Sequence, residues 1–127
     1  MAGNILIIDD DKLIAVTLKR LLTREGYDVA TAHSGKRALA LMEKFDFDLV
    51  MSDIKMPEMD GIETVKKIRE YLAQSHKKPI PEIFITAYAK EEIYQQALEL
   101  GACGYIEKPF DIKALLLTTR QALEKGA

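Results

Sequence analysis

Short apolar runs alternate with segments of helical periodicity along almost the whole chain. Each run is rich in β-branched residues and bounded by polar ones, which is typical of a strand covered on both faces. The runs lie at residues 5–8, 29–32, 49–52, 83–85 and 105–106. The segments that follow them carry apolar residues at helical spacing, as Leu18, Leu21 and Leu22 do after the first run. The pattern therefore predicts five alternations of strand and helix.

Capping residues mark where the predicted helices begin and end. Asp11 and Ser34 each precede a helical segment and can accept hydrogen bonds from its first N–H groups. Gly26 and Gly101 follow the first and fourth helical segments, where a glycine commonly ends a helix. The fourth helix is expected at residues 91–100 and the last around residues 112–123. Right-handed crossovers place such helices on both faces of one parallel sheet, so we expect an α/β fold.

Polar residues follow the predicted strands at the carboxyl end of the sheet, where open α/β sheets bind ligands. Asp9 and Asp10 follow the first strand, Asp53 the third, Thr86 the fourth and Lys108 the fifth. Each alone has an ordinary explanation, as a helix cap, a turn residue, a strand end or a solvated lysine. Together, at the same end of one sheet, they predict a site of carboxylates, a hydroxyl and an ammonium group.

The clustered carboxylates predict a bound cation. Ionised carboxylates repel one another when no positive charge lies between them. Oxygen ligands favour Mg²⁺, with Mn²⁺ as a second possibility, and no His or Cys is placed to favour zinc. One carboxylate can then attack phosphorus while the cation and Lys108 neutralise charge on the transferring group. The pocket is therefore suited to an aspartyl phosphate.

Length, charge and composition exclude several classes of protein. The 127 residues suffice for one compact domain, expected over residues 1–127, and not for two. A formal net charge of −2 without a basic cluster argues against direct binding of nucleic acid. No apolar run approaches the roughly 18 residues of a membrane span, so we expect a cytoplasmic protein without membrane contact. Cys103, the only cysteine, is expected to be a small buried residue.

Four motifs cover residues 5–10, 52–61, 85–87 and 104–110. In combination they resemble the motifs of the response-regulator receiver domain of two-component signalling. The resemblance extends over about the whole chain and implies a flavodoxin-like fold, (βα)5, with strand order 2-1-3-4-5. It also implies a phosphoacceptor whose phosphorylation switches partner binding. Such a protein is not an enzyme beyond its own phosphorylation and slow dephosphorylation.

The resemblance assigns roles to the site residues. Asp53 would accept a phosphoryl group from a phosphohistidine of a sensor histidine kinase or histidine phosphotransfer protein. Asp10, Asp53 and the backbone carbonyl of Lys55 would bind Mg²⁺, and Asp9 would act through a water. Lys108 would pair with the phosphate.

The resemblance further implies a conformational switch. Thr86 would donate its hydroxyl to a phosphoryl oxygen in the active state, and Tyr105 would then turn inward. Ala87 is small enough to let its loop close on the phosphate. The Lys108–Pro109 bond is expected to be a cis peptide that fixes the approach of the lysine.

Several alternatives remain open at this point. A stand-alone phosphorelay or chemotaxis-type regulator competes with a receiver cut out of a larger transcription factor or hybrid kinase. An aspartyl-nucleophile phosphohydrolase is disfavoured because Leu13 stands where the haloacid-dehalogenase-like pattern has Thr. A flavodoxin-like cofactor binder is disfavoured because the aspartates of the first loop would repel a phosphate. The downstream protein target is unknown.

The predicted first helix carries more apolar residues than one core-facing stripe needs. The surplus consists of Leu13, Ile14 and Val16, at the end of the helix beside the acidic pocket. We expect these residues to dock the phosphodonor protein. The alternative for Leu13 and Val16 is burial in an unusually wide stripe. The loop His76-Lys77-Lys78-Pro79 has no interpretation from the sequence.

Overall fold

A computed structural model describes residues 3–87 and 92–126 of the chain. The strands are β1 (Asn4–Ile8), β2 (Asp28–Ala32), β3 (Leu49–Asp53), β4 (Glu82–Thr86) and β5 (Gly104–Glu107). The helices are α1 (Lys12–Arg24), α2 (Gly35–Lys44), α3 (Gly61–Gln74), α4 (Glu92–Glu99) and α5 (Ile112–Gly126). All strand pairs are parallel, and the strand order is β2-β1-β3-β4-β5. The predicted α/β fold and its strand order are confirmed.

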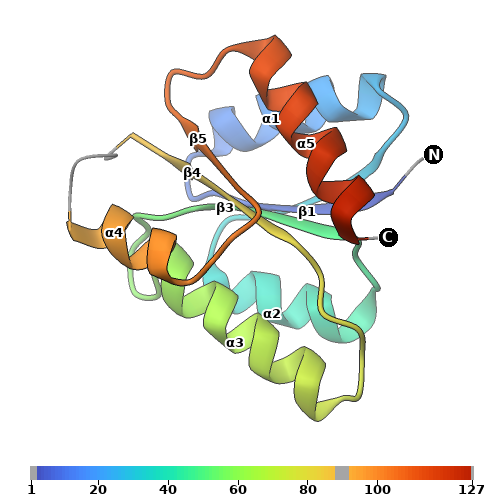
Figure 1. Ribbon diagram of the computed structural model, residues 1–127, viewed down its shortest axis with the longest axis vertical. Helices are drawn as coiled ribbons and strands as arrows, with labels where there is room; N and C mark the ends of the chain where they lie inside the picture. The colour runs from blue at the N-terminus through green and yellow to red at the C-terminus, as the bar shows by residue number, and fades with distance from the viewer. Residues whose placement is uncertain (1–2, 88–91, 127) are drawn as a thin grey trace.

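Helices cover both faces of the sheet (Figure 1). The side chains of Ile5 and Ile7 pack in one core with residues of α1 and α5. The intervening Leu6 and Ile8 pack in a second core with residues of α2 and α3. A third, smaller cluster joins Phe84 of β4 to α3 and α4. The first strand reads as a continuous apolar run because neither of its faces meets water.

The element ends differ slightly from the sequence-based expectation. Each strand extends by one residue beyond its apolar run at one or both ends, because the hydrogen bonds of a ladder do not require apolar side chains. Asp11 and Ser34 cap α1 and α2 as predicted, and Gly26 and Gly101 have φ of 96° and 74° after α1 and α4. Glu91, the expected start of the fourth helix, lies outside the described residues.

The prediction that Cys103 is buried is wrong, because its side chain is exposed. Cys103 belongs to the loop between α4 and β5, where its N–H donates to the carbonyl of Glu82 at 2.8 Å. The backbone, not the thiol, is therefore the part of this residue that is anchored. Among the helices that the structure describes, none combines the length and the apolar character that a bilayer crossing requires.

Candidate functional site

The parallel register of β1 and β3 brings the predicted acidic residues together. Ile8 pairs with Ser52, so the residues that follow, Asp9 and Asp53, end neighbouring strands side by side. Carboxylate oxygens of Asp9, Asp10 and Asp53 all lie within 4.8 Å of one another. Asp9 is 1% and Asp53 7% exposed, whereas Asp10 is open to solvent. The cluster therefore has two buried carboxylates and one at its mouth.

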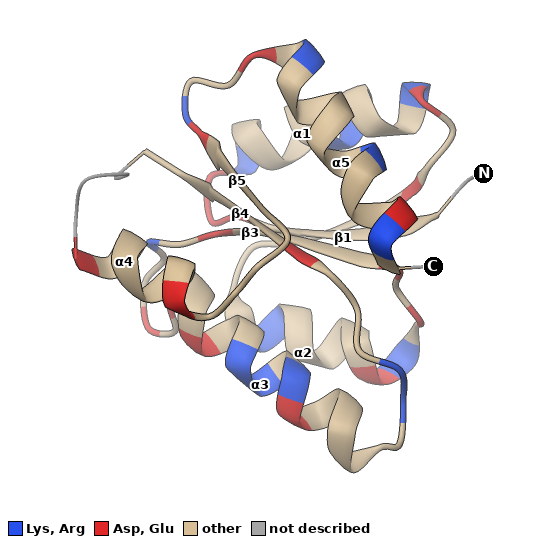
Figure 2. Cartoon of the chain, viewed as in Figure 1, with Lys and Arg blue, Asp and Glu red and all other residues tan. Residues whose placement is uncertain are grey.

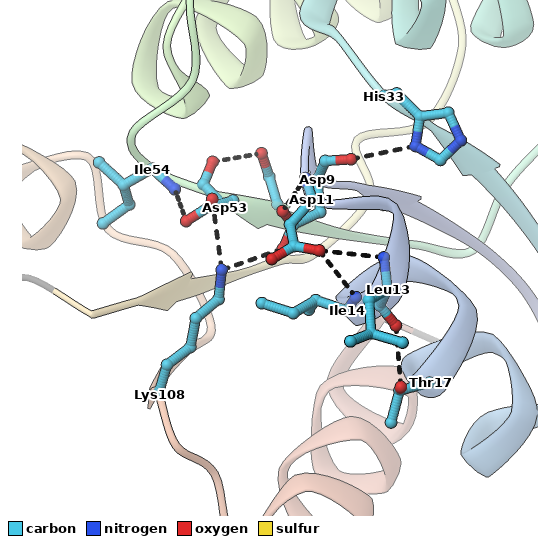
Figure 3. Close-up of polar contacts among 10 residues, drawn as sticks. Asp9, Asp11, Leu13, Ile14, Thr17, His33, Asp53, Ile54 and Lys108 are labelled. Atoms are coloured by element: carbon cyan, nitrogen blue, oxygen red, sulfur yellow. Dashed lines mark hydrogen bonds and ion pairs between the residues drawn. The ribbon is translucent and has the colours of Figure 1, made fainter.

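Lys108 lies between the two buried carboxylates (Figure 3). Its Nζ donates to Asp9 Oδ2 at 3.1 Å and lies 3.3 Å from Asp53 Oδ2. The other oxygen of each carboxylate accepts from a backbone N–H, Asp11 N to Asp9 Oδ1 and Ile54 N to Asp53 Oδ1, both at 2.9 Å. Both carboxylates are thus held in fixed orientations by one ammonium group and two amides.

The electrostatics of the cluster raise the proton affinity of Asp53. Burial, followed by the negative charge of Asp9, raises the pKa of Asp53 to about 6. Lys108 and the N–H of Ile54 act in the opposite direction but do not cancel these effects. Burial alone would lower the pKa of Lys108, yet Asp53 and Asp9 raise it above its ordinary value. Lys108 therefore stays charged, and among the described residues it is the cation that pairs with both buried carboxylates.

Asp11, the third acid of the first loop, has a different task. Its carboxylate accepts hydrogen bonds from the N–H groups of Leu13 and Ile14 at 3.0 and 3.3 Å. This is helix capping, and it starts α1 directly behind the site. The run of three aspartates therefore divides into two residues of the acidic cluster and one cap.

The loop between β3 and α3 passes close to Asp53 and depends on a glycine. The N–H of Gly61 donates to the carbonyl of Ile54 at 2.7 Å. A Cβ atom at position 61 would lie 2.0 Å from the carbonyl oxygen of Asp53, so no other residue fits without moving the loop. Asp60 caps α3 through a 2.8 Å bond from Glu63 N. Lys55 lies in this loop with an exposed side chain.

The predicted switch residues lie around the end of β4. Thr86 is fully buried, and its carbonyl accepts from Lys108 N at 2.8 Å, which ties the end of β5 to β4. Ala87 follows at the surface. Tyr105 is half-buried, and its hydroxyl donates to the carbonyl of Ala97 in α4 at 2.9 Å. The Lys108–Pro109 bond is cis, as expected.

Aromatic neighbours hold the ring of Tyr105 in this position. It stacks with Phe84, with ring centroids 6.3 Å apart, and meets the edge of Tyr94 at 5.9 Å. Burial raises the pKa of its hydroxyl. The inward turn of Tyr105 stays a prediction.

Sequence analysis did not single out His33, which also lies at the site. His33 follows β2, the neighbour of β1, and its Nδ1 lies 3.2 Å from the carbonyl oxygen of Asp9 (Figure 3). The signal was available, because β2 ends at the same edge of the sheet as the other strands. Its imidazole helps to fix the backbone that carries Asp9.

The surplus apolar residues of α1 separate into two kinds. Leu13 is 75% and Val16 47% exposed, so they form an apolar surface beside the acidic cluster. The inclusion of Ile14 in that surface is wrong, because its side chain is half-buried against the core shared by α1 and α5. Helical geometry explains the difference, since Ile14 lies on the same face as the buried Leu18.

Comparison with known proteins agrees with this geometry. The family model of the response regulator receiver domain matches residues 5–120. The transcriptional regulatory protein ZraR of Klebsiella oxytoca is 42% identical over 120 residues, which are 94% of this chain and 26% of ZraR. The transcriptional regulatory protein CpxR of Klebsiella pneumoniae is 40% identical, over 98% of this chain and 50% of CpxR. The chain thus spans between a quarter and half of these relatives.

A solved structure shows the same fold over nearly the same length. The chemotaxis protein CheY4 of Vibrio cholerae superposes with a TM-score of 0.85 at 35% sequence identity. The match covers 96% of this chain and 99% of CheY4. The likeness therefore includes all the strands and helices that build the acidic cluster.

Proposed function

This chain belongs to the response regulator receiver domain family. From that membership we propose that Asp53 is the residue that becomes phosphorylated. As a receiver domain, the chain serves as a phosphoacceptor in two-component signalling. The observation that carries the assignment is the carboxylate of Asp53 at the end of the central strand β3, next to Lys108 and two further acids.

Electrostatics favour Asp53 over the other two acids as the nucleophile. Its pKa, raised to about 6, leaves it largely ionised at neutral pH, yet its oxygen is more basic than that of an ordinary carboxylate. Asp9 is more deeply buried, with its oxygens directed at Asp11 N and Lys108. Asp10 is exposed at the mouth of the cluster. This position suits a metal ligand better than a nucleophile.

The residues of the acidic cluster fit a magnesium ion. Carboxylate oxygens from Asp9, Asp10 and Asp53 lie within 4.8 Å of one another, and hard oxygen donors are what Mg²⁺ and Mn²⁺ prefer. Asp10 and Asp53 would bind the ion directly, with the carbonyl of Lys55, and Asp9 through a water. A bound ion would offset buried negative charge and neutralise charge on the transferring phosphoryl oxygens.

The reaction follows from the placement of the side chains. A carboxylate oxygen of Asp53 attacks the phosphorus of a phosphohistidine, an O–P bond forms, and the P–N bond breaks with its electron pair returning to the imidazole. The ammonium group of Lys108 lies where it can pair with the phosphoryl oxygens. Thr86 supplies a hydroxyl to one of these oxygens in the active state. The product is a mixed anhydride of Asp53 and phosphate.

We propose that residues 1–127 form a single receiver domain working in the cytoplasm. A sensor histidine kinase or a histidine phosphotransfer protein supplies the phosphoryl group, and phosphorylation changes binding to a protein partner. Both curated relatives above are named transcriptional regulators and are longer than this chain, so its output is proposed only at this general level.

The test is phosphorylation of Asp53→Asn by a small phosphodonor such as acetyl phosphate in Mg²⁺. Wild-type protein should gain a hydroxylamine-sensitive phosphate visible by intact mass spectrometry, and Asp53→Asn should gain none. Asp28→Asn is the matched control, because Asp28 is an exposed acid at the opposite end of the sheet. An unchanged phosphate adduct on Asp53→Asn would overturn the assignment.

A further inference from the structure

A second concave site lies at the opposite end of the sheet from Asp53. We call it the basal cleft and define it by Arg69, Lys77, Lys78, Glu82, Cys103 and Lys125. Its volume is about 650 Å³, within the range of about 300–1,000 Å³ typical of small-molecule sites. It is remote from the acidic cluster because Glu82 begins β4 whereas Thr86 ends it. The phosphorylation site therefore does not account for it.

The rim of the basal cleft is cationic. Arg69, Lys77, Lys78 and Lys125 line it, and Glu82 is the one carboxylate among the described residues that do so. Figure 2 shows basic segments along α3, in the loop that precedes β4 and at the end of α5. Lys125 at the end of α5 is far in sequence from Arg69, Lys77 and Lys78, so the fold completes the positive rim. Such a rim complements an anion.

The carboxylate of the cleft is already neutralised. Arg69 holds Glu82 with two bonds, Nε to Oε2 at 2.9 Å and Nη2 to Oε1 at 2.7 Å. The Glu82 side chain is 5% exposed, whereas that of Arg69 is 39% exposed. The pair thus buries its negative end and leaves part of the Arg69 side chain open to solvent. A ligand in the cleft would meet cations rather than the carboxylate of Glu82.

The lysines of the rim differ in how firmly they are held. Lys77 forms a 3.2 Å ion pair with Asp46, and its ammonium group lies 5.5 Å from the centre of the Tyr71 ring. Lys78 and Lys125 are exposed. Lys78 and Lys125 come from different elements, the loop before β4 and α5. Their side chains can therefore approach a ligand from two sides of the cleft.

The basal cleft also has an aliphatic part, which we call its floor and define by Leu72, Ala73, Pro79, Ile80 and Pro81. None of these side chains has a polar atom. An inorganic anion would gain nothing from such a floor, whereas an aliphatic chain would bury surface against it. The cationic rim and the aliphatic floor complement two parts of one molecule.

We propose that the basal cleft binds a small amphipathic anion, a molecule with a phosphate or carboxylate group on an aliphatic chain. The anionic group lies among the exposed ammonium groups of Lys78 and Lys125 and the guanidinium group of Arg69. The aliphatic chain lies against Ile80 and Pro81, which are only partly buried. This site is independent of the phosphorylation of Asp53.

Cys103 provides a direct reporter of occupancy. It lines the cleft, is exposed, and is the only cysteine of the chain, so a thiol reagent modifies this position alone. The neutral reagent iodoacetamide is not itself attracted to the cationic rim. A ligand over the cleft should therefore slow alkylation by covering the thiol.

The experiment measures the alkylation rate of Cys103 in wild-type protein with octyl phosphate, inorganic phosphate or octanol. At octyl phosphate about ten times its Kd, roughly one cleft in eleven is free, so alkylation should slow about tenfold. Inorganic phosphate and octanol at the same concentrations should slow it little, because each carries only half of the recognised chemistry. Equal protection by either single-feature probe would overturn the proposal.

Charge-reversal variants test the location. Lys78→Glu/Lys125→Glu should weaken protection by octyl phosphate about tenfold or more, since two exposed favourable pairs become repulsive. The matched control is Lys66→Glu/Lys67→Glu, which changes the net charge equally on exposed residues of α3 that do not line the cleft. Both variants should retain phosphorylation of Asp53. Equal weakening in the control would show a non-specific charge effect and overturn the site.

A further measurement with a peptide tests whether the cleft binds a protein segment instead of a small molecule. A short acidic peptide with leucines carries the same two chemical features on a polypeptide. Protection of Cys103 by this peptide, with none by octyl phosphate, would identify the cleft as a docking surface for a protein segment and overturn the proposal.

Discussion

At the scale of single residues, the site is built from charges that would not be buried without one another. Lys108 pairs with two buried carboxylates, and each carboxylate is also oriented by a backbone N–H. Removing a buried charge partner leaves an uncompensated charge, which costs more than the pair contributes. The residual negative charge on Asp53 is therefore a source of instability in the metal-free protein, and the same charge attracts a cation.

The pH dependence of stability follows from the pKa of Asp53. Because the folded pKa of about 6 exceeds the unfolded value of 3.8, the folded state binds protons more tightly. In EDTA, the free energy of unfolding should thus fall as pH rises from about 4 to about 7. The free energy of unfolding of Asp53→Asn should not fall over this pH range. Relative to wild type, it should therefore increase by on the order of 1–2 kcal/mol between pH values of about 4 and about 7.

Urea unfolding at several pH values measures this difference. Asp28→Asn serves as the control, because an exposed carboxylate at the other end of the sheet should give a wild-type pH profile. Parallel profiles for wild type and Asp53→Asn would contradict the argument that burial and Asp9 raise the proton affinity of Asp53.

The partly buried ion pair of Arg69 and Glu82 gives a separate prediction. Arg69→Met leaves the carboxylate of Glu82, 4% exposed, without its cation, and should destabilise the fold by about 2–4 kcal/mol. Lys66→Met, on the exposed face of the same helix, should change stability by less than about 0.5 kcal/mol. Equal unfolding midpoints for the two variants would show that the pair contributes no stability.

At the scale of elements, local signals determined most of what the sequence could reveal. Asp11 and Ser34 were recognisable caps because each precedes an apolar helical stripe and accepts from nearby N–H groups. Cys103 and Ile14 were not predictable in the same way, because their exposure depends on tertiary neighbours. A loop anchored through its backbone leaves the Cys103 thiol outside, and Ile14 packs against the core cluster that includes residues of α1 and α5.

The apolar surface of Leu13 and Val16 predicts a docking role for α1. Leu13→Lys should slow phosphotransfer from a histidine phosphodonor protein about tenfold. Leu13 is exposed in the free chain, and the substitution would place a charge where the docked partner buries an apolar side chain. Its reaction with acetyl phosphate should be unchanged, because Leu13 is 75% exposed and outside the acidic cluster.

Phe45→Lys is the matched control for this experiment. Phe45 is a 56% exposed apolar residue that follows α2, and it lines a different hollow with Asn4 and Asp28, at the start of β1 and β2. Its phosphotransfer rate should equal that of wild type. A Leu13→Lys variant that slows with both the protein and acetyl phosphate would indicate a damaged pocket instead of a lost docking contact.

At the scale of the whole molecule, parallel topology explains why the site could be anticipated from sequence. All strands end at the same edge of the sheet, so residues that end or directly follow a strand converge there without any local sequence signal joining them. Asp53 and Thr86 end their strands, and Asp9 and Lys108 directly follow theirs. The sequence could not reveal which acids are buried, how far the pKa of Asp53 rises, or that His33 contacts the backbone of Asp9. These depend on distances that strand order alone does not define.

The basal cleft had no counterpart in the sequence-based interpretation for the same reason. Its rim combines residues of α3, of the loop before β4 and of the end of α5. The sequence alone gives no interpretation of the loop His76–Pro79, of which Lys77, Lys78 and Pro79 line the cleft. The acidic cluster thus lies at the carboxyl end of the sheet, and the basal cleft with its cationic rim lies at the amino end.

The response of the whole fold to metal gives the last prediction. A cation that binds only the folded state stabilises it by mass action, so Mg²⁺ at about ten times its Kd adds roughly 1.4 kcal/mol. For a domain of this size that gain should raise the Tm by roughly 4–6 °C above the value in EDTA. Asp10→Asn should unfold near the wild-type temperature in EDTA, because its carboxylate is exposed, yet should lose most of the rise with Mg²⁺. Sodium chloride at matched ionic strength should give neither protein this rise, since a monovalent ion does not replace a ligand-bound divalent one. Differential scanning calorimetry of the two proteins decides the matter: an equal rise in both would remove Asp10 from the metal site, and no rise in wild type would remove the metal site itself.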